Sequence, residues 1–157
     1  MLVAYKGKSF WPSKIIRFIN WSDYSHVAWM TKQGGIYEAW PPKVRYCASV
    51  HVDHQKGTEV EVFSIPGMTD KQREIVEDYL AKQVGKKYDW PAVLRFIPRM
   101  DMVEHTTVKW FCSELIMAAL KKAGINPLKR IPNYKVTPGM LVTSPIFHFK
   151  TKFKVGS

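Results

Sequence analysis

The sequence predicts a single α+β domain over residues 1–157, with an antiparallel sheet packed against helices. The first observation is a block of short segments rich in β-branched and aromatic residues, separated by the turn-prone QGG, PP and HQKG. The second is helical periodicity before and after that block, without the long strand-helix alternation of a parallel sheet. The third is a content of 46% hydrophobic residues in 157 positions, which supports one core and excludes intrinsic disorder.

Six strands are expected along the chain. Tyr5 lies on the expected first strand, and four further strands are expected in the central block, at residues 25–31, 35–40, 44–52 and 59–65. The tail, residues 146–153, is expected to return to the sheet as a last strand. Between the first strand and the block, SFWPSKIIRFIN (residues 9–20) has apolar side chains at helical spacing and predicts a short amphipathic helix.

Three further helices follow the strand block. The segment TDKQ at residues 69–72 fits a capping box, and an apolar stripe then runs to Gly85, which is typical of a helix end. A short helix is expected to begin near Asp89. The last helix is expected over residues 112–124, from a cysteine to a glycine.

The chain is strongly basic, with 24 Lys and Arg against 13 Asp and Glu and a net charge of +11. No acidic residue follows Glu114, so the C-terminal part is a candidate surface for phosphate, nucleic acid or anionic lipid. A solvated basic surface without a partner is the alternative interpretation. No helix-turn-helix or RNP sequence is present, so sequence-specific nucleic-acid recognition is not expected.

The two cysteines, Cys47 and Cys112, are too few and too far apart for a disulfide scaffold or a CxxC motif. The start, MLVAYKGKSF, lacks the apolar region of a signal peptide, and no run of about 18 apolar residues occurs. We therefore expect a cytoplasmic protein by default, with a phage or viral origin left open.

Cys112 is the candidate nucleophile. It stands at the predicted start of a helix, where free backbone N–H groups and the positive end of the helix dipole favour the thiolate. Its own amide is also a candidate donor to an oxyanion. The competing interpretation is a small buried apolar residue, which free cysteines often are.

His26 and Glu38 are the candidate partners of that cysteine. His26 follows a polar turn at the head of a strand, and Glu38 lies on the strand that the QGG turn pairs with it. A carboxylate on the far nitrogen of an imidazole fixes the tautomer and stabilises the imidazolium, as in a catalytic triad. A hydrogen-bonded strand histidine and an exposed strand glutamate are the structural alternatives.

Three segments together resemble the circularly permuted NlpC-like cysteine hydrolases of papain-like fold, often called YiiX-like: SKIIRFINWSDYSHVAWM, GIYEAW and KWFCSELIMAALKKAG. The resemblance covers most of the chain and matches the family's histidine to His26, its acidic residue to Glu38 and its nucleophile to Cys112. The resemblance implies a permuted papain-like fold, in which an antiparallel sheet packs against a helix with the cysteine at its N-terminus. The fold is called permuted because the histidine strand precedes the cysteine helix here, whereas ordinary papain-like enzymes have the reverse order. The bulky aromatics near these positions depart from the pattern: Trp29, Trp40 and Trp110.

Other residues compete for roles in a site. Alternation along a strand would place Cys47, His51 and Asp53 on one face as zinc ligands, but no second ligand pair is visible and no metal is expected. His54, like His51, is read as a polar residue at the edge of a turn.

Two further types of group are weighed for catalysis. His105 is an alternative base, although its EHTT setting indicates a loop, and Glu114 is expected to cap or to be buried. The hydroxyls of Tyr5 and Tyr24 are weak candidates for oxyanion donors.

The function expected from these residues is a cysteine hydrolase, an amidase or peptidase that cleaves an amide through a thioester intermediate and needs no cofactor. The resemblance implies peptides, cell-wall stem peptides or lipid-linked amides as substrate classes. A thioesterase or acyltransferase using the same triad is one alternative. A catalytically inactive module that binds anionic membrane or nucleic-acid surfaces is the other, and the oligomeric state is open.

Overall fold

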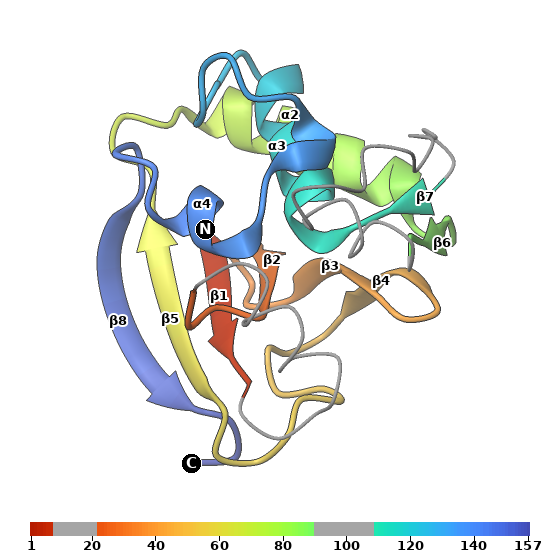
Figure 1. Cartoon of the computed structure of the whole chain (residues 1–157), viewed down its shortest axis with the longest axis vertical. Helices are drawn as coiled ribbons and strands as arrows, with labels where there is room; N and C mark the ends of the chain where they lie inside the picture. The colour runs from red at the N-terminus through yellow and green to blue at the C-terminus, as the bar shows by residue number, and fades with distance from the viewer. Residues whose placement is uncertain (8–21, 90–108) are drawn as a thin grey trace.

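The computed structural model describes residues 1–7, 22–89 and 109–157. Within these residues eight strands form one sheet in the order β7-β6-β4-β3-β2-β1-β5-β8 (Figure 1). All neighbours are antiparallel except β6 and β7, which are parallel. The predicted α+β class is confirmed, with a mixed sheet in place of a purely antiparallel one.

The elements have the following bounds. The strands are β1 (Leu2–Lys6), β2 (His26–Met30), β3 (Ile36–Trp40), β4 (Lys43–Cys47), β5 (Glu59–Ser64), β6 (Lys87–Tyr88), β7 (Lys109–Trp110) and β8 (His148–Lys154). The helices are α2 (Asp70–Gln83), α3 (Cys112–Lys122) and α4 (Pro138–Val142), with a short 3₁₀ turn, η2 (Asn133–Lys135).

The two faces of the sheet carry separate hydrophobic clusters. On one face α2 and α3 pack over the central strands (Figure 1). Trp29 and Leu115 are among the fully buried side chains of this cluster. The other face has a smaller cluster that includes Tyr5 and receives Val50 from the loop after β4 and Val155 from the end of the chain. The sheet thus separates a helix-covered core from a loop-covered one.

Two of the predicted helices lie within the described residues, and the structure confirms both. Thr69 accepts a hydrogen bond from the Gln72 amide at 3.1 Å and the Gln72 side chain accepts one from the Thr69 amide at 3.0 Å, which is the complete capping box. Val76 and Leu80 of the apolar stripe are buried, whereas Val84 is 45% exposed because the helix has ended before it. The Cys112 helix is confirmed as α3.

The predicted strand at residues 44–52 is too long. β4 ends at Cys47, and the chain then turns, because the Ser49 hydroxyl accepts a hydrogen bond from the His51 amide at 3.2 Å and Asp53 adopts a positive φ of 58°. Such local turns compete with strand extension. The expectation that Cys47, His51 and Asp53 share one face of a strand is therefore wrong.

The other elements agree with the sequence only in part. The tail strand is confirmed as β8, and the short elements β6, β7, η2 and α4 were not predicted. The helix predicted at residues 9–20 and the one expected to begin near Asp89 lie outside the described residues, apart from Asp89 itself. None of the helices in the described part of the chain combines the length and the apolar character needed to cross a membrane.

Candidate active site

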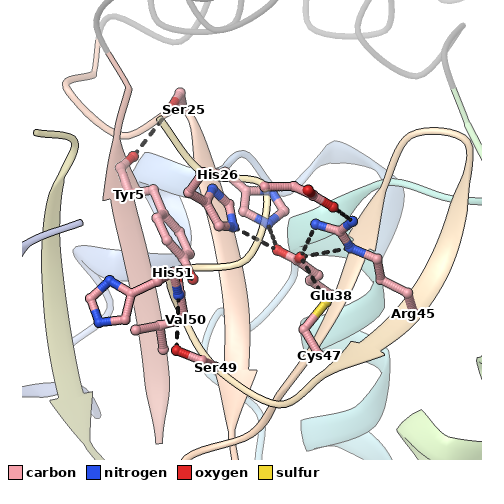
Figure 2. A network of polar contacts seen from close by, with 11 residues as sticks. Tyr5, Ser25, His26, Glu38, Arg45, Cys47, Ser49, Val50 and His51 are labelled. Atoms are coloured by element: carbon pink, nitrogen blue, oxygen red, sulfur yellow. Dashed lines mark hydrogen bonds and ion pairs between the residues drawn. The ribbon is translucent and has the colours of Figure 1, made fainter. Parts of the chain in front are cut away.

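His26 and Glu38 meet on neighbouring strands. His26 is the first residue of β2 and Glu38 is the middle residue of β3, and His26 Nε2 donates a hydrogen bond of 2.7 Å to Glu38 Oε2 (Figure 2). Both side chains are buried, Glu38 completely. The two predicted partners, His26 and Glu38, are thus brought together. The bond uses Nε2 of His26, so Nδ1 is the ring nitrogen that does not contact Glu38.

Arg45 holds the other oxygen of the Glu38 carboxylate. It stands opposite Glu38 in the β3–β4 register, and its Nε and Nη2 atoms donate to Glu38 Oε1 at 2.9 and 2.7 Å. Its Nη1 atom donates to Asp53 Oδ2 at 2.5 Å. Charge-assisted bonds of this kind are stronger than neutral ones, so the orientation of the buried carboxylate is fixed from both sides.

His54 also contacts Glu38. Its Nε2 atom lies 3.2 Å from Glu38 Oε2, the oxygen that His26 contacts. The His54 ring stacks on Tyr5 with centroids 3.9 Å apart and meets Trp40 edge-on at 4.6 Å. The turn at Asp53 and this stacking bring a loop histidine over the buried carboxylate.

These contacts shift the titration of the buried groups. Burial alone would raise the pKa of Glu38, but the hydrogen bonds from His26 and His54 lower it well below its usual value. Burial lowers the pKa of His26, and this desolvation outweighs the opposing effect of Glu38. Near neutral pH the pair is therefore a carboxylate and an uncharged imidazole.

Cys112 is the first residue of α3 and is 1% exposed. Burial raises the pKa of its thiol to about 12, although backbone N–H groups of Val27, Ser113 and Cys112 itself lower it. The helix N-terminus thus acts in the expected direction, but desolvation is the larger effect. The Glu38 carboxylate also raises this pKa, which places Cys112 within electrostatic range of the pair.

Cys112 meets β2 on the helix-covered face of the sheet, where Val27 and Trp29 belong to the same hydrophobic cluster. The β2–β3 register includes Trp29 with Tyr37, but it stops before Val27 would meet Ala39. The Val27 amide, next in the chain to His26, instead donates to the Cys112 thiol. Because side chains alternate along a strand, His26 and Glu38 lie with Tyr5 and Cys47 on the loop-covered face of the sheet, opposite the face that carries Val27 and Cys112. Among the described residues the structure therefore brings His26 and Glu38 together but gives no hydrogen bond between Cys112 and His26; the sulfur accepts one from the amide of the next residue, Val27.

The other candidate residues have different surroundings. The Tyr5 hydroxyl donates to the Val50 carbonyl at 3.2 Å, and the Tyr24 hydroxyl donates to Glu61 Oε2 at 2.6 Å. Glu114 is 1% exposed, in keeping with the expected buried role. His105 lies outside the described residues.

The set of Cys47, His51 and Asp53 is dispersed. Asp53 binds Arg45, the exposed His51 accepts a bond of 3.3 Å from the Gly156 amide, and the Cys47 thiol donates to Glu38 Oε1 at 3.8 Å. These three residues do not form the zinc site that strand alternation suggested.

Two residues of the site were missed by the sequence analysis, Arg45 and His54. Arg45 had a usable signal, because a tight PP connection places it directly across from Glu38 and opposite charges pair across strands. His54 had none, since its position depends on the path of a loop.

Comparison with known proteins supports the fold. No protein-family model and no curated protein sequence matches the chain. Among solved structures, the crystal structure of metalloprotein yiiX from Escherichia coli O157:H7 is similar with a TM-score of 0.74 and 18% identity, over 97% of this chain and 96% of that chain. The chain therefore has a YiiX-like fold, and the resemblance noted in the sequence is confirmed at that level.

Proposed function

We propose that this protein is a cysteine hydrolase in which Cys112 is the nucleophile, His26 the base and Glu38 the residue that orients the base. The observation that carries the proposal is the 2.7 Å bond from His26 Nε2 to the buried Glu38 carboxylate, while the Cys112 sulfur accepts a hydrogen bond from the amide of Val27, the residue that follows His26. This bond sets the tautomer with the proton on Nε2, so Nδ1 is the nitrogen that accepts the thiol proton. The proposal includes a permuted papain-like arrangement of these three residues.

The first chemical step is the attack of sulfur on an acyl carbon. As the bond from Cys112 Sγ to carbon forms, the thiol proton passes to His26 Nδ1, and the imidazolium is stabilised by Glu38. This step requires the start of β2 to shift, because the imidazole and the thiol lie on opposite faces of the sheet in this structure. The amides of Cys112 and Ser113 at the start of α3 are the candidate donors to the oxyanion. The imidazolium then returns its proton to the leaving amine or alcohol as the carbon-heteroatom bond breaks.

Water completes the reaction. His26 Nδ1 accepts a proton from a water molecule as its oxygen attacks the thioester carbon; the carbon-sulfur bond then breaks to release the acid, and the imidazolium returns the proton to the Cys112 sulfur. If an alcohol or amine replaces that water, the same residues perform acyl transfer. The substrate classes we propose are peptides, cell-wall stem peptides and lipid-linked amides.

The burial of both groups supports a neutral resting pair. The pKa of Cys112 is raised and that of His26 is lowered, so the thiol and the imidazole carry no charge before substrate arrives. The proton therefore moves during the attack, as in serine hydrolases, and no thiolate-imidazolium pair forms beforehand. Slow reaction of the resting thiol with iodoacetamide at neutral pH follows from this arrangement.

Hydrolysis of p-nitrophenyl acetate tests the proposal without knowledge of the natural substrate. We expect turnover by the wild type, with an acetyl group on Cys112 detected by mass spectrometry after an acid quench. Cys112→Ala should abolish turnover, and Glu38→Gln should lower kcat by a factor on the order of 10⁴, because the histidine is left in the wrong tautomer. The matched control, Cys47→Ser, removes the other thiol of the chain and should retain turnover.

Two results would contradict the mechanism. Turnover by the Cys112→Ala variant at the wild-type rate would remove the nucleophile from the proposal. An acetyl group found on Cys47 in place of Cys112 would assign the reactive thiol to the loop-covered face of the sheet, which carries His26 and Glu38.

A further inference from the structure

The His54 loop brings a third donor to the His26–Glu38 pair. One ring nitrogen of His26, one ring nitrogen of His54 and one carboxylate oxygen of Glu38 all lie within 4.8 Å of one another. Both imidazoles approach the same oxygen, Oε2, at 2.7 and 3.2 Å. In a tetrahedral zinc site the ligand atoms are about 3.4 Å apart, given metal-ligand distances of about 2.0–2.2 Å, so small rotations of the rings would accommodate an ion.

The donor types suit a divalent transition metal. Two imidazoles and one carboxylate form a known ligand set for Zn²⁺ and Fe²⁺, whereas Mg²⁺ and Ca²⁺ prefer oxygen ligands alone. Three protein ligands leave a fourth position open to water or another donor. The Cys47 thiol contacts Oε1, on the Arg45 side of the carboxylate, so it is not part of this set.

The surroundings fix the ligands in place. Arg45 binds only Oε1 of Glu38, which leaves Oε2 directed at the two histidines. His54 is held between the rings of Tyr5 and Trp40. Outer contacts of this kind orient metal ligands and strengthen binding.

The charge around the cluster is compatible with a cation. Arg45 is the nearby positive group, and the Glu38 and Asp53 carboxylates both bind it. Two carboxylates against one guanidinium leave a net negative cluster when the histidines are neutral. A bound dication would replace the hydrogen bonds from the two histidines to Glu38. It would meet a cluster of net negative charge, so the Glu38 carboxylate would remain paired with a positive charge.

We propose that His26, Glu38 and His54 bind a divalent transition-metal ion such as Zn²⁺, and that the bound ion switches off the hydrolase. The inhibitory role rests on the proposed function, while the binding site does not. A metal on His26 Nε2 requires the ring proton to reside on Nδ1. Nδ1 is then unable to accept the thiol proton of Cys112, so one residue cannot serve as metal ligand and general base at once.

Titration calorimetry with Zn²⁺ tests the site directly. We expect the wild type to bind one ion, with no comparable binding of Mg²⁺ or Ca²⁺. The His54→Gln variant keeps a hydrogen-bond donor for Glu38 but loses the imidazole ligand, and its affinity should fall by more than the about 10- to 100-fold typical of outer-contact changes. The matched control, His51→Ala, removes an exposed histidine from the same loop and should bind as the wild type does.

Co²⁺ absorption gives a second readout that does not depend on activity. A tetrahedral nitrogen and oxygen site should produce visible Co²⁺ bands without a thiolate charge-transfer band, and Cys47→Ser should leave the spectrum unchanged. If His54→Gln and the wild type bind zinc with equal affinity, and circular dichroism shows that both proteins are folded, the proposed site is overturned. A thiolate band lost in Cys47→Ser would overturn the ligand set.

The inhibitory role is tested with p-nitrophenyl acetate. Zn²⁺ should suppress wild-type turnover at the concentrations that saturate the site, and the ratio of rates with and without Zn²⁺ should return toward one in His54→Gln. Unimpaired turnover at saturating Zn²⁺ would overturn the inhibitory role. If the wild type binds zinc but Cys112→Ala hydrolyses p-nitrophenyl acetate as fast as the wild type does, the hydrolase proposal is refuted and the metal site is retained.

Discussion

Glu38 connects four side chains through two oxygens. Oε1 accepts from Arg45 and Cys47, and Oε2 accepts from His26 and His54, all at a carboxylate with no solvent exposure. Removing one partner of such a buried network costs more than the net contribution of the pair, because a charge is left without compensation. The carboxylate thus organises the site as well as orienting the proposed base.

At the same scale, the buried thiol of Cys112 makes stability depend on alkaline pH. An unfolded cysteine ionises near about 8.5, whereas burial raises the pKa of Cys112 to about 12 in the folded state. The contribution of this thiol to stability is fully present below the unfolded pKa and is lost as pH rises toward the folded one. We expect the free energy of unfolding to fall by about 1.4 kcal/mol per pH unit in that range.

Urea unfolding at pH 8, 9 and 10 measures this effect. Cys112→Ser should lose the Cys112 share of the alkaline decline, while Cys47→Ser should retain it. If the free energy of unfolding depends on pH in the same way for the wild type and for Cys112→Ser, burial does not raise the pKa of the Cys112 thiol.

At the scale of elements, the boundaries follow from local sequence signals. Helix α2 begins where the capping box satisfies two free amides, and α3 ends before Gly124, which has a φ of 76°. The β2–β3 pairing is different, because its register ends at the Trp29–Tyr37 pair and the Val27 amide donates to a sulfur from the distant helix α3. Local signals therefore define the elements, and tertiary contacts define where pairing stops.

The capping box of α2 gives a prediction for a single element. Thr69→Ala removes the hydroxyl that accepts from the Gln72 amide, so the free energy of unfolding should fall by about 1 kcal/mol, with a range of about 0.5–2 kcal/mol. Thr69→Ser retains the acceptor and should remain within a few tenths of a kcal/mol of the wild type. Urea denaturation monitored by circular dichroism measures both, and equal loss in the two variants would contradict the capping explanation.

The parts that sequence could predict are those set by short-range patterns. The QGG turn and alternation placed His26 and Glu38 on one hairpin, and the capping signals located α2. The position of His54 could not be inferred, because it depends on a turn at Asp53 and on stacking against Tyr5 from the first strand. The pKa of Cys112 was also beyond inference, since its direction depends on how deeply α3 packs.

On the scale of the whole molecule, charge is distributed unevenly. The edge strand β8 is exposed along most of its length and carries Lys150, Lys152 and Lys154, with Phe149 55% exposed beside them. Lysines on an edge strand discourage pairing with another sheet. They also form the surface that we propose for contact with anionic lipid.

Vesicle binding tests that surface. The chain should bind phosphatidylglycerol vesicles at low salt and dissociate as salt is raised. Because each lysine near an anionic membrane contributes about 1 kcal/mol, replacing Lys150, Lys152 and Lys154 with Gln should weaken binding by roughly 100-fold. The matched control replaces three exposed lysines of another region, Lys71, Lys82 and Lys87, and an equal loss there would contradict a specific role for β8.

The pairing of β5 with β8 has a consequence for folding. It joins Ser64 to His148, 84 positions apart, so the chain between them forms a closed loop that contains α2 and α3. Contacts between residues far apart in sequence form slowly, because the entropy of closing the loop opposes them before any contact stabilises the product. The hairpin of β2 and β3 can therefore assemble well before α3 is held against it, and we expect Cys112 to be among the later residues to reach its place.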